Sequence, residues 1–191
     1  MSMPTPRQPF LQLHRRRPLR TAAGLALAAL LACPPLQAQA QDAEYALKAA
    51  FVFNFAVFTQ WPEPALPAGS PLQLCAYGGN TMLEALISLN DKLVNGHRVQ
   101  LRQLDAATGA RNCHVLVLDA RDRERWSGLR RELAGANVLT VADDRQIGAS
   151  GAVLALMNDH SRIIFDADLE AARQAHLTLS SKLLRLARSA Q

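Results

Sequence analysis

Apolar side chains are most concentrated in one stretch of this chain, residues 48–62, whose sequence is KAAFVFNFAVFTQWP. Phe53 and Val57 form one apolar stripe of a predicted helix, beside a larger stripe that we expect to face the core. The residues of the larger stripe are spaced by four, four and three positions, as on one helical face: Leu47, Phe51, Phe55 and Phe58. A helix this apolar has to be covered on more than one side. Pro62 ends it, because proline lacks a backbone donor and keeps Trp61 out of helical geometry.

Strands and helices alternate in the rest of the chain. The expected strands are residues 72–77, 93–104 with a turn at 95–96, 113–119, 137–142, and a hairpin of 152–157 and 162–165 across residues 158–161. The expected helices are residues 82–89, 121–134, 169–175 and a last one that begins at Ser180 or Ser181, whereas residues 146–151 are expected to be loop. This order favours an α/β fold with a mostly parallel sheet, right-handed crossovers and one antiparallel hairpin.

The last predicted helix has two distinct faces. We expect its apolar residues to point inward and its cations to form a basic stripe near the helix C-terminus, where positive charge suits the helix dipole. The inward residues are Leu183, Leu184, Leu186 and Ala187, and the stripe is Lys182, Arg185 and Arg188.

Residues 1–40 have the pattern of a secretory signal peptide. A basic segment, residues 14–20, precedes the apolar run 21–33, and residues 38–40 form a cleavage site of the A-x-A type. The apolar run is short for a membrane span, which needs roughly 17 to 25 residues. We therefore expect residues 41–191 to form a single periplasmic domain. Two alternatives stay open, a twin-arginine export signal and lipoprotein processing at Cys33.

Charge is unevenly distributed along the chain. The whole sequence has 21 Lys and Arg against 16 Asp and Glu, a net charge of +5, and a pI of about 9.6. Five of the arginines lie in residues 1–40, which contain no acid, so residues 41–191 are formally neutral. The high pI therefore reflects the signal peptide, and we expect no nucleic-acid partner.

Two cysteines, Cys75 and Cys113, remain once the signal peptide is removed. In an oxidising compartment such a pair is a candidate disulfide. Each cysteine lies at a predicted strand, so the two can meet only if those strands are neighbours. A bridge that closes a loop of about 38 residues stabilises the fold by roughly 3 to 4 kcal/mol in the chain-entropy model. The alternative is a pair of buried free thiols.

Catalytic and metal-binding motifs are missing from the sequence. It contains no G-x-S-x-G, H-E-x-x-H or G-x-x-x-x-G-K-[ST] motif. The histidines of residues 41–191 fall on separate predicted elements without the spacing of metal ligands: His97, His114, His160 and His176. We therefore expect no enzyme activity, no metal and no cofactor.

A small polar crevice is predicted where the parallel strands end. Asp119 and Asp143 follow two of these strands, and open α/β sheets place ligands at that edge. The alternative is that such acids cap helices or stay solvated. The residues expected to line the crevice are Gly78, Gly79, Asn80, Asp119, Arg121 and Asp143.

Two segments of the chain resemble one protein family. Residues 48–62 are similar to an opening pattern, Lys-Ala-Ala-aromatic-x-aromatic-Asn-Phe-Ala-x-Phe-x-x-Trp-Pro, and residues 179–188 (LSSKLLRLAR) to a closing Ser-Ser-Lys-Leu-Leu-Arg-Leu-Ala motif. Both are typical of the YfiR-like family, also called the DUF4154 domain. The resemblance implies a three-layer α/β/α sandwich. Regulators of the YfiR type can carry two cysteine pairs, and this chain lacks the residues for the second, so redox sensing through that pair is not expected.

The resemblance also implies a function. It indicates a periplasmic protein that binds the sensory portion of an inner-membrane diguanylate cyclase and holds it inactive, so that release raises cyclic di-GMP in the cell. We also expect a homodimer. Phe53 and Val57 are candidate contact residues in a dimer or partner interface, where aromatic side chains are favoured, unless another part of the same domain covers them. A second hypothesis is a periplasmic small-molecule-binding protein coupled to a membrane sensor or transporter, which a pocket at the strand ends would favour.

Overall fold

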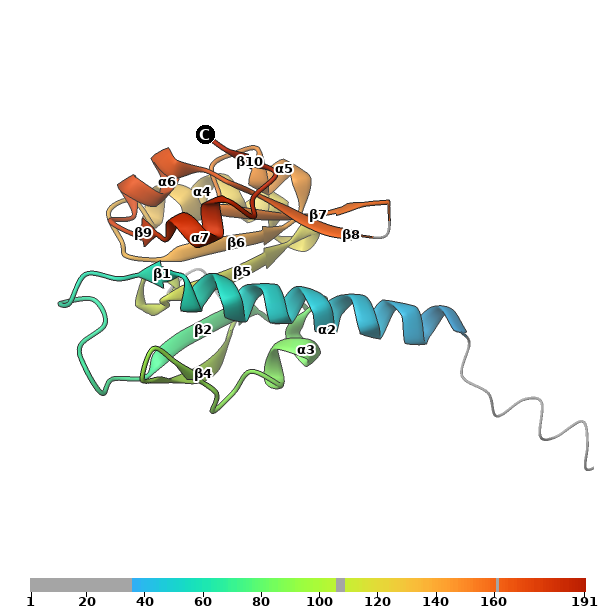
Figure 1. Ribbon diagram of the computed structural model, residues 1–191, viewed down its shortest axis with the longest axis horizontal. Coiled ribbons are helices and arrows are strands. Elements are labelled where there is room, and N and C mark those ends of the chain that lie inside the picture. Colours follow the sequence, from blue (N-terminus) through green and yellow to red (C-terminus); the bar gives the residue numbers. More distant parts are fainter. Residues whose placement is uncertain (1–35, 106–108, 161) are drawn as a thin grey trace, which may run out of the picture. The chain divides into compact units, whose positions relative to one another are not determined.

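The computed structural model describes residues 36–105, 109–160 and 162–191 (Figure 1). The chain divides into two units, residues 1–38 and residues 39–191, and the sheet belongs to the second. Apart from residues 36–40, the predicted signal peptide lies outside the described residues. Its cleavage, the twin-arginine alternative and the processing of Cys33 therefore stay predictions.

A mostly parallel sheet is the framework of this unit. The described strands follow the order β10, β8, β7, β6, β5, β2, β4, β3, and neighbours are parallel except in the β7–β8 and β3–β4 hairpins. Their bounds are β2 Leu72–Tyr77, β3 Leu93–Val94, β4 His97–Leu104, β5 Val115–Asp119, β6 Leu139–Asp143, β7 Leu154–Asp159, β8 Arg162–Ala167 and β10 Ser189–Ala190. Two short strands, β1 (Thr59–Gln60) and β9 (Thr178–Leu179), pair antiparallel with each other.

One face of the sheet is covered by the long helix α2 and three shorter helices (Figure 1). Their bounds are α2 Leu36–Val57, α3 Leu83–Ile87, α6 Leu169–Gln174 and α7 Ser181–Leu184. The predicted stripe of α2 is partly wrong, because Leu47 is 49% exposed and the small side chains of Ala49 and Ala56 are buried instead. Small residues on the contact line let the helix lie close to the strands. The ring of Phe55, buried as predicted, lies 4.8 Å from that of Phe165 in β8.

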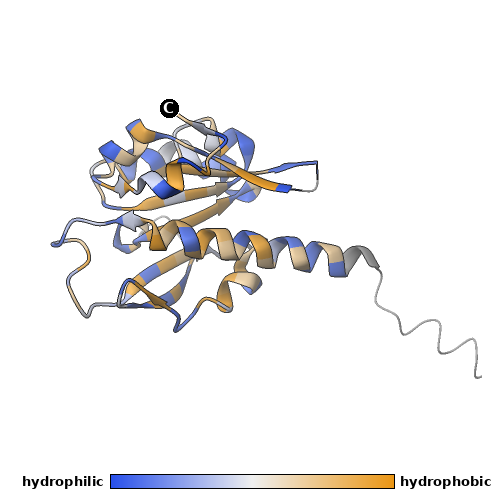
Figure 2. Cartoon of the chain, in the orientation of Figure 1, coloured by the Kyte–Doolittle hydropathy of each residue, from blue (hydrophilic) through white to orange (hydrophobic). Residues whose placement is uncertain are grey.

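The opposite face is covered by α4 (Arg123–Glu132), α5 (Arg145–Gly148) and the 3-10 turns η1 (Ala110–Asn112) and η2 (Ala120–Asp122). Trp126, Leu129 and Leu133 point from this layer into a second core. Hydrophobic residues run along the central strands, and the helices carry both hydrophobic and hydrophilic residues (Figure 2). The α/β/α fold class with a mostly parallel sheet is therefore confirmed, and the structure adds the β3–β4 hairpin at the turn predicted for residues 95–96.

Three local predictions differ from the structure. Residues 146–151 do not form only a loop, because Asp144 caps α5 through the backbone N–H of Ile147. The hairpin turn is shorter than four residues, since strand pairing continues to residues 159 and 162. The last helix ends at Leu184, so Leu186 is 71% exposed and Arg188 lies outside the helix. There the chain leaves the helix to join β8 through β10.

Candidate functional site

A buried lysine joins three segments near the carboxyl ends of the central strands. The Nζ atom of Lys48 lies 2.8 Å from Oδ1 of Asp143, at the end of β6, and 2.7 Å from Oε1 of Glu44, one helical turn earlier in α2. The side-chain amide of Asn158, near the tip of the β7–β8 hairpin, donates to Oε1 of Glu44 over 2.8 Å. The ion cluster therefore ties α2, β6 and the hairpin together.

The charges of this ion cluster are set by burial and pairing together. Burial lowers the pKa of Lys48, but hydrogen bonds to Asp143 and Glu44 outweigh that effect, so its pKa lies above its ordinary value. The hydrogen bond from Lys48 holds the pKa of Glu44 below its ordinary range. Burial raises the pKa of Asp143, and Lys48 opposes the rise. The lysine is therefore a protonated counter-ion at neutral pH and not a free amine nucleophile.

The residues of the predicted crevice largely come together at the end of β5, but the polar side-chain atoms of Asn80, Asp119 and Asp143 already bond within the chain. Asp119 accepts from the backbone N–H groups of Thr81 at 2.7 Å and of Arg121 at 2.9 Å. Both amide atoms of Asn80 bond to backbone groups. Asp143 is the neighbour of Asp119 across the two strands, yet its carboxylate belongs to the ion cluster. A ligand site in this crevice stays a prediction.

The two glycines of the predicted crevice form the turn after β2. Gly79 has a positive φ of 82°, which suits glycine, and a Cβ atom there would lie 3.3 Å from Nη1 of Arg121. A Cβ atom on Gly78 would lie 3.1 Å from the side-chain nitrogen of Gln103. The chain therefore passes close to two polar side chains at this turn.

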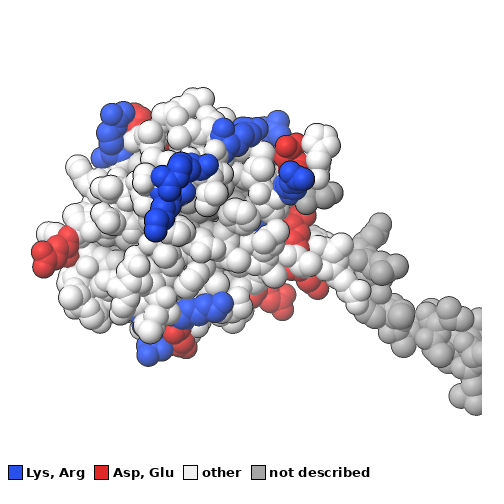
Figure 3. Space-filling view, in the orientation of Figure 1, with Lys and Arg blue, Asp and Glu red and all other residues white. Residues whose placement is uncertain are grey.

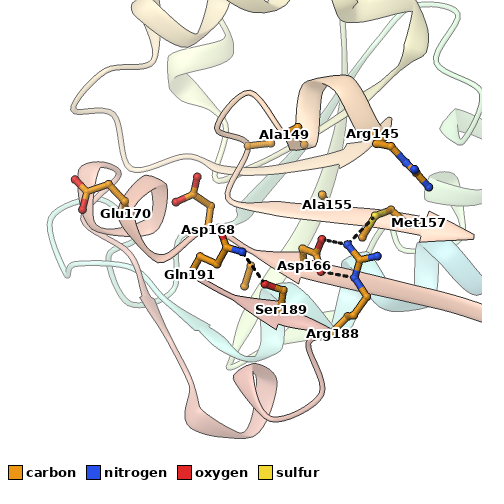
Figure 4. Close-up of a pocket in the computed structure, with 13 residues that line it drawn as sticks. Arg145, Ala149, Ala155, Met157, Asp166, Asp168, Glu170, Arg188, Ser189 and Gln191 are labelled. Atoms are coloured by element: carbon orange, nitrogen blue, oxygen red, sulfur yellow. Dashed lines mark hydrogen bonds and ion pairs between the residues drawn. The ribbon is translucent and has the colours of Figure 1, made fainter. Parts of the chain in front are cut away.

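A cavity of about 440 Å³ lies between α5, β7, β8 and the C-terminal segment (Figure 4). Its floor is made of small residues because α5 packs tightly on β7: a Cβ atom on Gly148 would lie only 2.5 Å from Cβ of Ala155. The sequence pattern does not indicate this cavity, since four separate segments of the chain contribute to it. The small residues that line it are Gly148, Ala149, Ala152, Ala155 and Ala167.

Charged groups surround this cavity. Arg188 pairs with both carboxylate oxygens of Asp166 and also approaches the sulfur of Met157 at 3.6 Å (Figure 4). Arg145, which lines the cavity from α5, has no ion-pair partner among the described residues. Met157 and Arg145 also line a second cavity, of about 200 Å³, beside Lys48. The two cavities therefore share lining residues at the start of α5.

The two cysteines predicted as a candidate pair form a disulfide. Their Cα atoms are 5.9 Å apart, and the bridge joins β2 to the residue two places before β5, which is its neighbour in the sheet. Cys75 and Cys113 are 0% and 3% exposed and lie in the core under α4. The bridge is therefore shielded from solvent on the face opposite α2.

The other predicted residues have structural surroundings. Phe53 and Val57 are half-buried against the core, and the Nζ atom of Lys92 lies 5.7 Å from the centre of the Phe53 ring. Nδ1 of His114 accepts a hydrogen bond from the backbone N–H of Gln73, and burial lowers the pKa of this histidine.

Two kinds of feature are absent from the described part of the chain. Within residues 36–105, 109–160 and 162–191, no three His, Cys, Asp or Glu side chains are grouped so that they could hold a metal ion. No helix in those ranges combines the length and the apolar character that crossing a membrane requires.

Comparison with known proteins places these features in a family. A solved structure of a conserved domain protein from Vibrio cholerae O1 biovar El Tor is 12% identical, with a TM-score of 0.46. The match covers 68% of this chain and 57% of that one, so the chain spans a little over half of that protein's length. A family model described as YfiR/HmsC-like, DUF4154, matches residues 45–188, a range that includes Lys48 of the ion cluster and Arg188 of the cavity. This chain therefore belongs to the YfiR/HmsC-like family, whose membership indicates a periplasmic regulatory protein.

Proposed function

We propose that this protein binds the sensory portion of an inner-membrane diguanylate cyclase and holds that enzyme inactive, so that release raises cyclic di-GMP in the cell. The observation that carries the proposal is the family match across residues 45–188. The ion cluster fits a binding role better than a catalytic one, because its lysine is fully paired and its carboxylates neutralise it. The protein then acts by contact, with no chemical step of its own.

Removal and capture test the proposal together. Deleting the gene should raise cyclic di-GMP, and restoring the exported protein should lower it again. A photoreactive residue placed at exposed Leu47, in α2, or at exposed Arg130, in α4, samples the two faces of the sheet without disturbing either core. We expect at least one of them to capture an inner-membrane protein with a diguanylate cyclase output domain. Unchanged cyclic di-GMP on deletion, with no membrane protein captured from either face of a folded protein, contradicts the proposal.

A second candidate function is small-molecule binding coupled to a membrane sensor or transporter. The observation that favours it is the cavity of about 440 Å³ with its apolar floor and charged rim. Ala149 lines this cavity and is exposed, so Ala149→Phe should fill the space without affecting the core. A metabolite that binds there should raise the melting temperature of the wild type and not of Ala149→Phe. Equal shifts in both proteins, or no shift with any metabolite of a broad panel, count against this function.

A further inference from the structure

We propose that the cavity between α5, β7, β8 and the C-terminal segment binds a short, extended peptide with free ends, about three small residues long. The carboxylate of the peptide pairs with Arg145, and its ammonium pairs with Asp168. This inference rests on the second candidate function, small-molecule binding in the same cavity, and names the chemical class of the ligand. It does not depend on which membrane protein, if any, this protein regulates.

Two unmatched charges of opposite sign line the cavity. Arg145 is exposed at the start of α5, and half-buried Asp168 directly precedes α6. Neither has an ion-pair partner among the described residues. The backbone N–H of Ala171 occupies one carboxylate oxygen of Asp168. The other charged groups at the rim are paired already: Arg188 with Asp166, and Glu170 with Arg173. A ligand that fits this rim therefore brings one anion and one cation.

The two unmatched charges lie at opposite ends of the cavity. Arg145 lines both cavities together with Met157, which places it beside the middle of β7. The backbone N–H of Asp168 donates to the carbonyl of Val153, directly before β7, over 2.9 Å. Four positions of extended chain separate these two points of β7, a distance of about 13 Å. Figure 4 agrees, because it shows Arg145 and Asp168 on opposite sides of the alanines of the floor.

This separation determines the length of the ligand. A free α-amino acid carries its ammonium and its carboxylate on the same carbon atom, so it cannot pair with both ends of the cavity. An extended peptide of three residues spans about 10 Å, and the long arginine side chain reaches across the remainder. The volume of about 440 Å³ lies in the range of about 300 to 1,000 Å³ that is typical of small-ligand sites.

The floor and one wall suit a peptide with small side chains. The floor consists of alanine and glycine, which offer shallow apolar contact to methyl groups. The wall offers the hydroxyl of Ser189 and the side-chain amide of Gln191 to peptide N–H and C=O groups, which need hydrogen-bond partners. This wall is held in place, because β10 pairs with β8 and the backbone N–H of Leu169 donates to the main-chain oxygen of Gln191 over 2.6 Å.

The surroundings favour a ligand whose charges balance. Charged groups of both signs are scattered over the face that Figure 3 shows, and most of that face is uncharged. No broad field of one sign therefore attracts a ligand that is only anionic or only cationic. A peptide with free ends has one charge of each sign, and it enters with the orientation that pairs both of them.

Titration with trialanine tests the proposal. Isothermal titration calorimetry measures the dissociation constants of trialanine, N-acetyl-trialanine, trialanine amide and alanine for the purified protein. We expect saturable binding of trialanine, because both of its charges find partners. Each blocked peptide should bind at least about tenfold more weakly, since it leaves one charged residue unpaired. Alanine should show no saturable binding.

Two variants assign the two ends of the peptide. Arg145→Gln should weaken the binding of trialanine at least about tenfold and leave the binding of trialanine amide unchanged, because the amide has no carboxylate to lose. Asp168→Asn should do the same for trialanine and N-acetyl-trialanine, and asparagine keeps the cap of α6. The matched control is Arg131→Gln, an exposed arginine of α4, which should bind trialanine like the wild type. Ala149→Phe should abolish binding, because it fills the cavity.

Several outcomes overturn the proposal. They are no binding of trialanine, alanine binding as tightly as trialanine, or equal losses for free and blocked peptides in Arg145→Gln and Asp168→Asn. If a metabolite still raises the melting temperature of the wild type and not that of Ala149→Phe, the second candidate function stands while the peptide is wrong. If neither trialanine nor any metabolite binds, both are wrong.

Discussion

Replacing Lys48 by methionine measures what the buried ion cluster contributes. Methionine keeps most of the apolar stem of lysine and removes only the ammonium. The side chains of Lys48 and Asp143 are 7% and 11% exposed, so the carboxylate stays buried without its partner. Glu44 is 36% exposed and can return to solvent. Breaking a buried pair from one side costs about 3 to 5 kcal/mol, and we expect the free energy of unfolding to fall by that amount near neutral pH.

The loss should depend on pH with a definite sign. Without Lys48, desolvation of Asp143 is no longer opposed, and the pKa of that carboxyl rises further above its ordinary value. A raised carboxyl pKa destabilises the fold at pH values above the unfolded pKa, and protonation on acidification relieves the effect. The difference between wild type and variant should therefore be largest near pH 7 and should shrink as the pH falls toward about 4.

Urea unfolding followed by circular dichroism at the two pH values is the assay. The control is Lys48→Met combined with Asp143→Leu, which replaces the buried pair by apolar side chains and should recover most of the lost stability. A loss below about 1 kcal/mol for Lys48→Met would refute the reasoning, since that is the range of ordinary surface changes. An equal loss at both pH values would refute it as well.

Three other substitutions test separate contacts by the same unfolding assay. Replacing both bridged cysteines by serine opens a loop of 38 residues and should cost about 3 to 4 kcal/mol; a cost near zero would mean that the bridge does not restrain the unfolded chain. Gly148→Ala sets a Cβ atom against Ala155 and should cost about 1 to 3 kcal/mol of stability. Gly128→Ala in α4, where a Cβ atom meets nothing within 4 Å, should instead stabilise the fold by about 0.5 to 1 kcal/mol. Changes in stability of the same sign for both substitutions are inconsistent with the packing described. The hydrogen bond from Arg123 holds the pKa of Asp144 below its ordinary value. At pH values above the ordinary carboxyl pKa, this carboxylate therefore stabilises the fold, and the stabilisation is lost as the pH falls through its folded pKa. Asp144→Asn should therefore cost about 1 kcal/mol near pH 7 and nothing in strong acid, and a cost that does not change with pH would argue against the ion pair.

Sequence patterns predicted the elements whose signal is local. The strand predicted for residues 72–77 is β2 at those bounds, because an apolar run between a proline-rich connector and a glycine pair has few other conformations. Asp168, which directly precedes the helix predicted for residues 169–175, caps α6, and aspartate is a favoured residue at that position. The two-residue strands β1, β9 and β10 carry no periodicity, since a pair of residues cannot show one. They form only because distant segments bring an open edge beside them.

The candidate site was harder to predict because its contacts are long-range. Lys48 stands among alanines and phenylalanines, and the four-residue spacing from Glu44 was the only local sign that it pairs at all. Its main partner, Asp143, lies 95 residues away in the chain. Leu47 was assigned to the core because the spacing of apolar residues shows which of them share a helical face. It does not show which face of the helix packs on the sheet. The cysteine pair could be proposed from the sequence, because residues 41–191 contain two cysteines and therefore allow one pairing.

The packing of α2 also sets an order of events when the chain folds as it emerges, from a ribosome or through an export channel. The most apolar helix of the domain comes out first, while the strand that holds Phe165, against which Phe55 packs, comes out near the end. Contacts so distant in sequence form late and leave apolar surface exposed in the meantime. A chaperone that binds aromatic segments would therefore have its longest opportunity at residues 51–58, and an arrested chain that lacks β8 should be its best client.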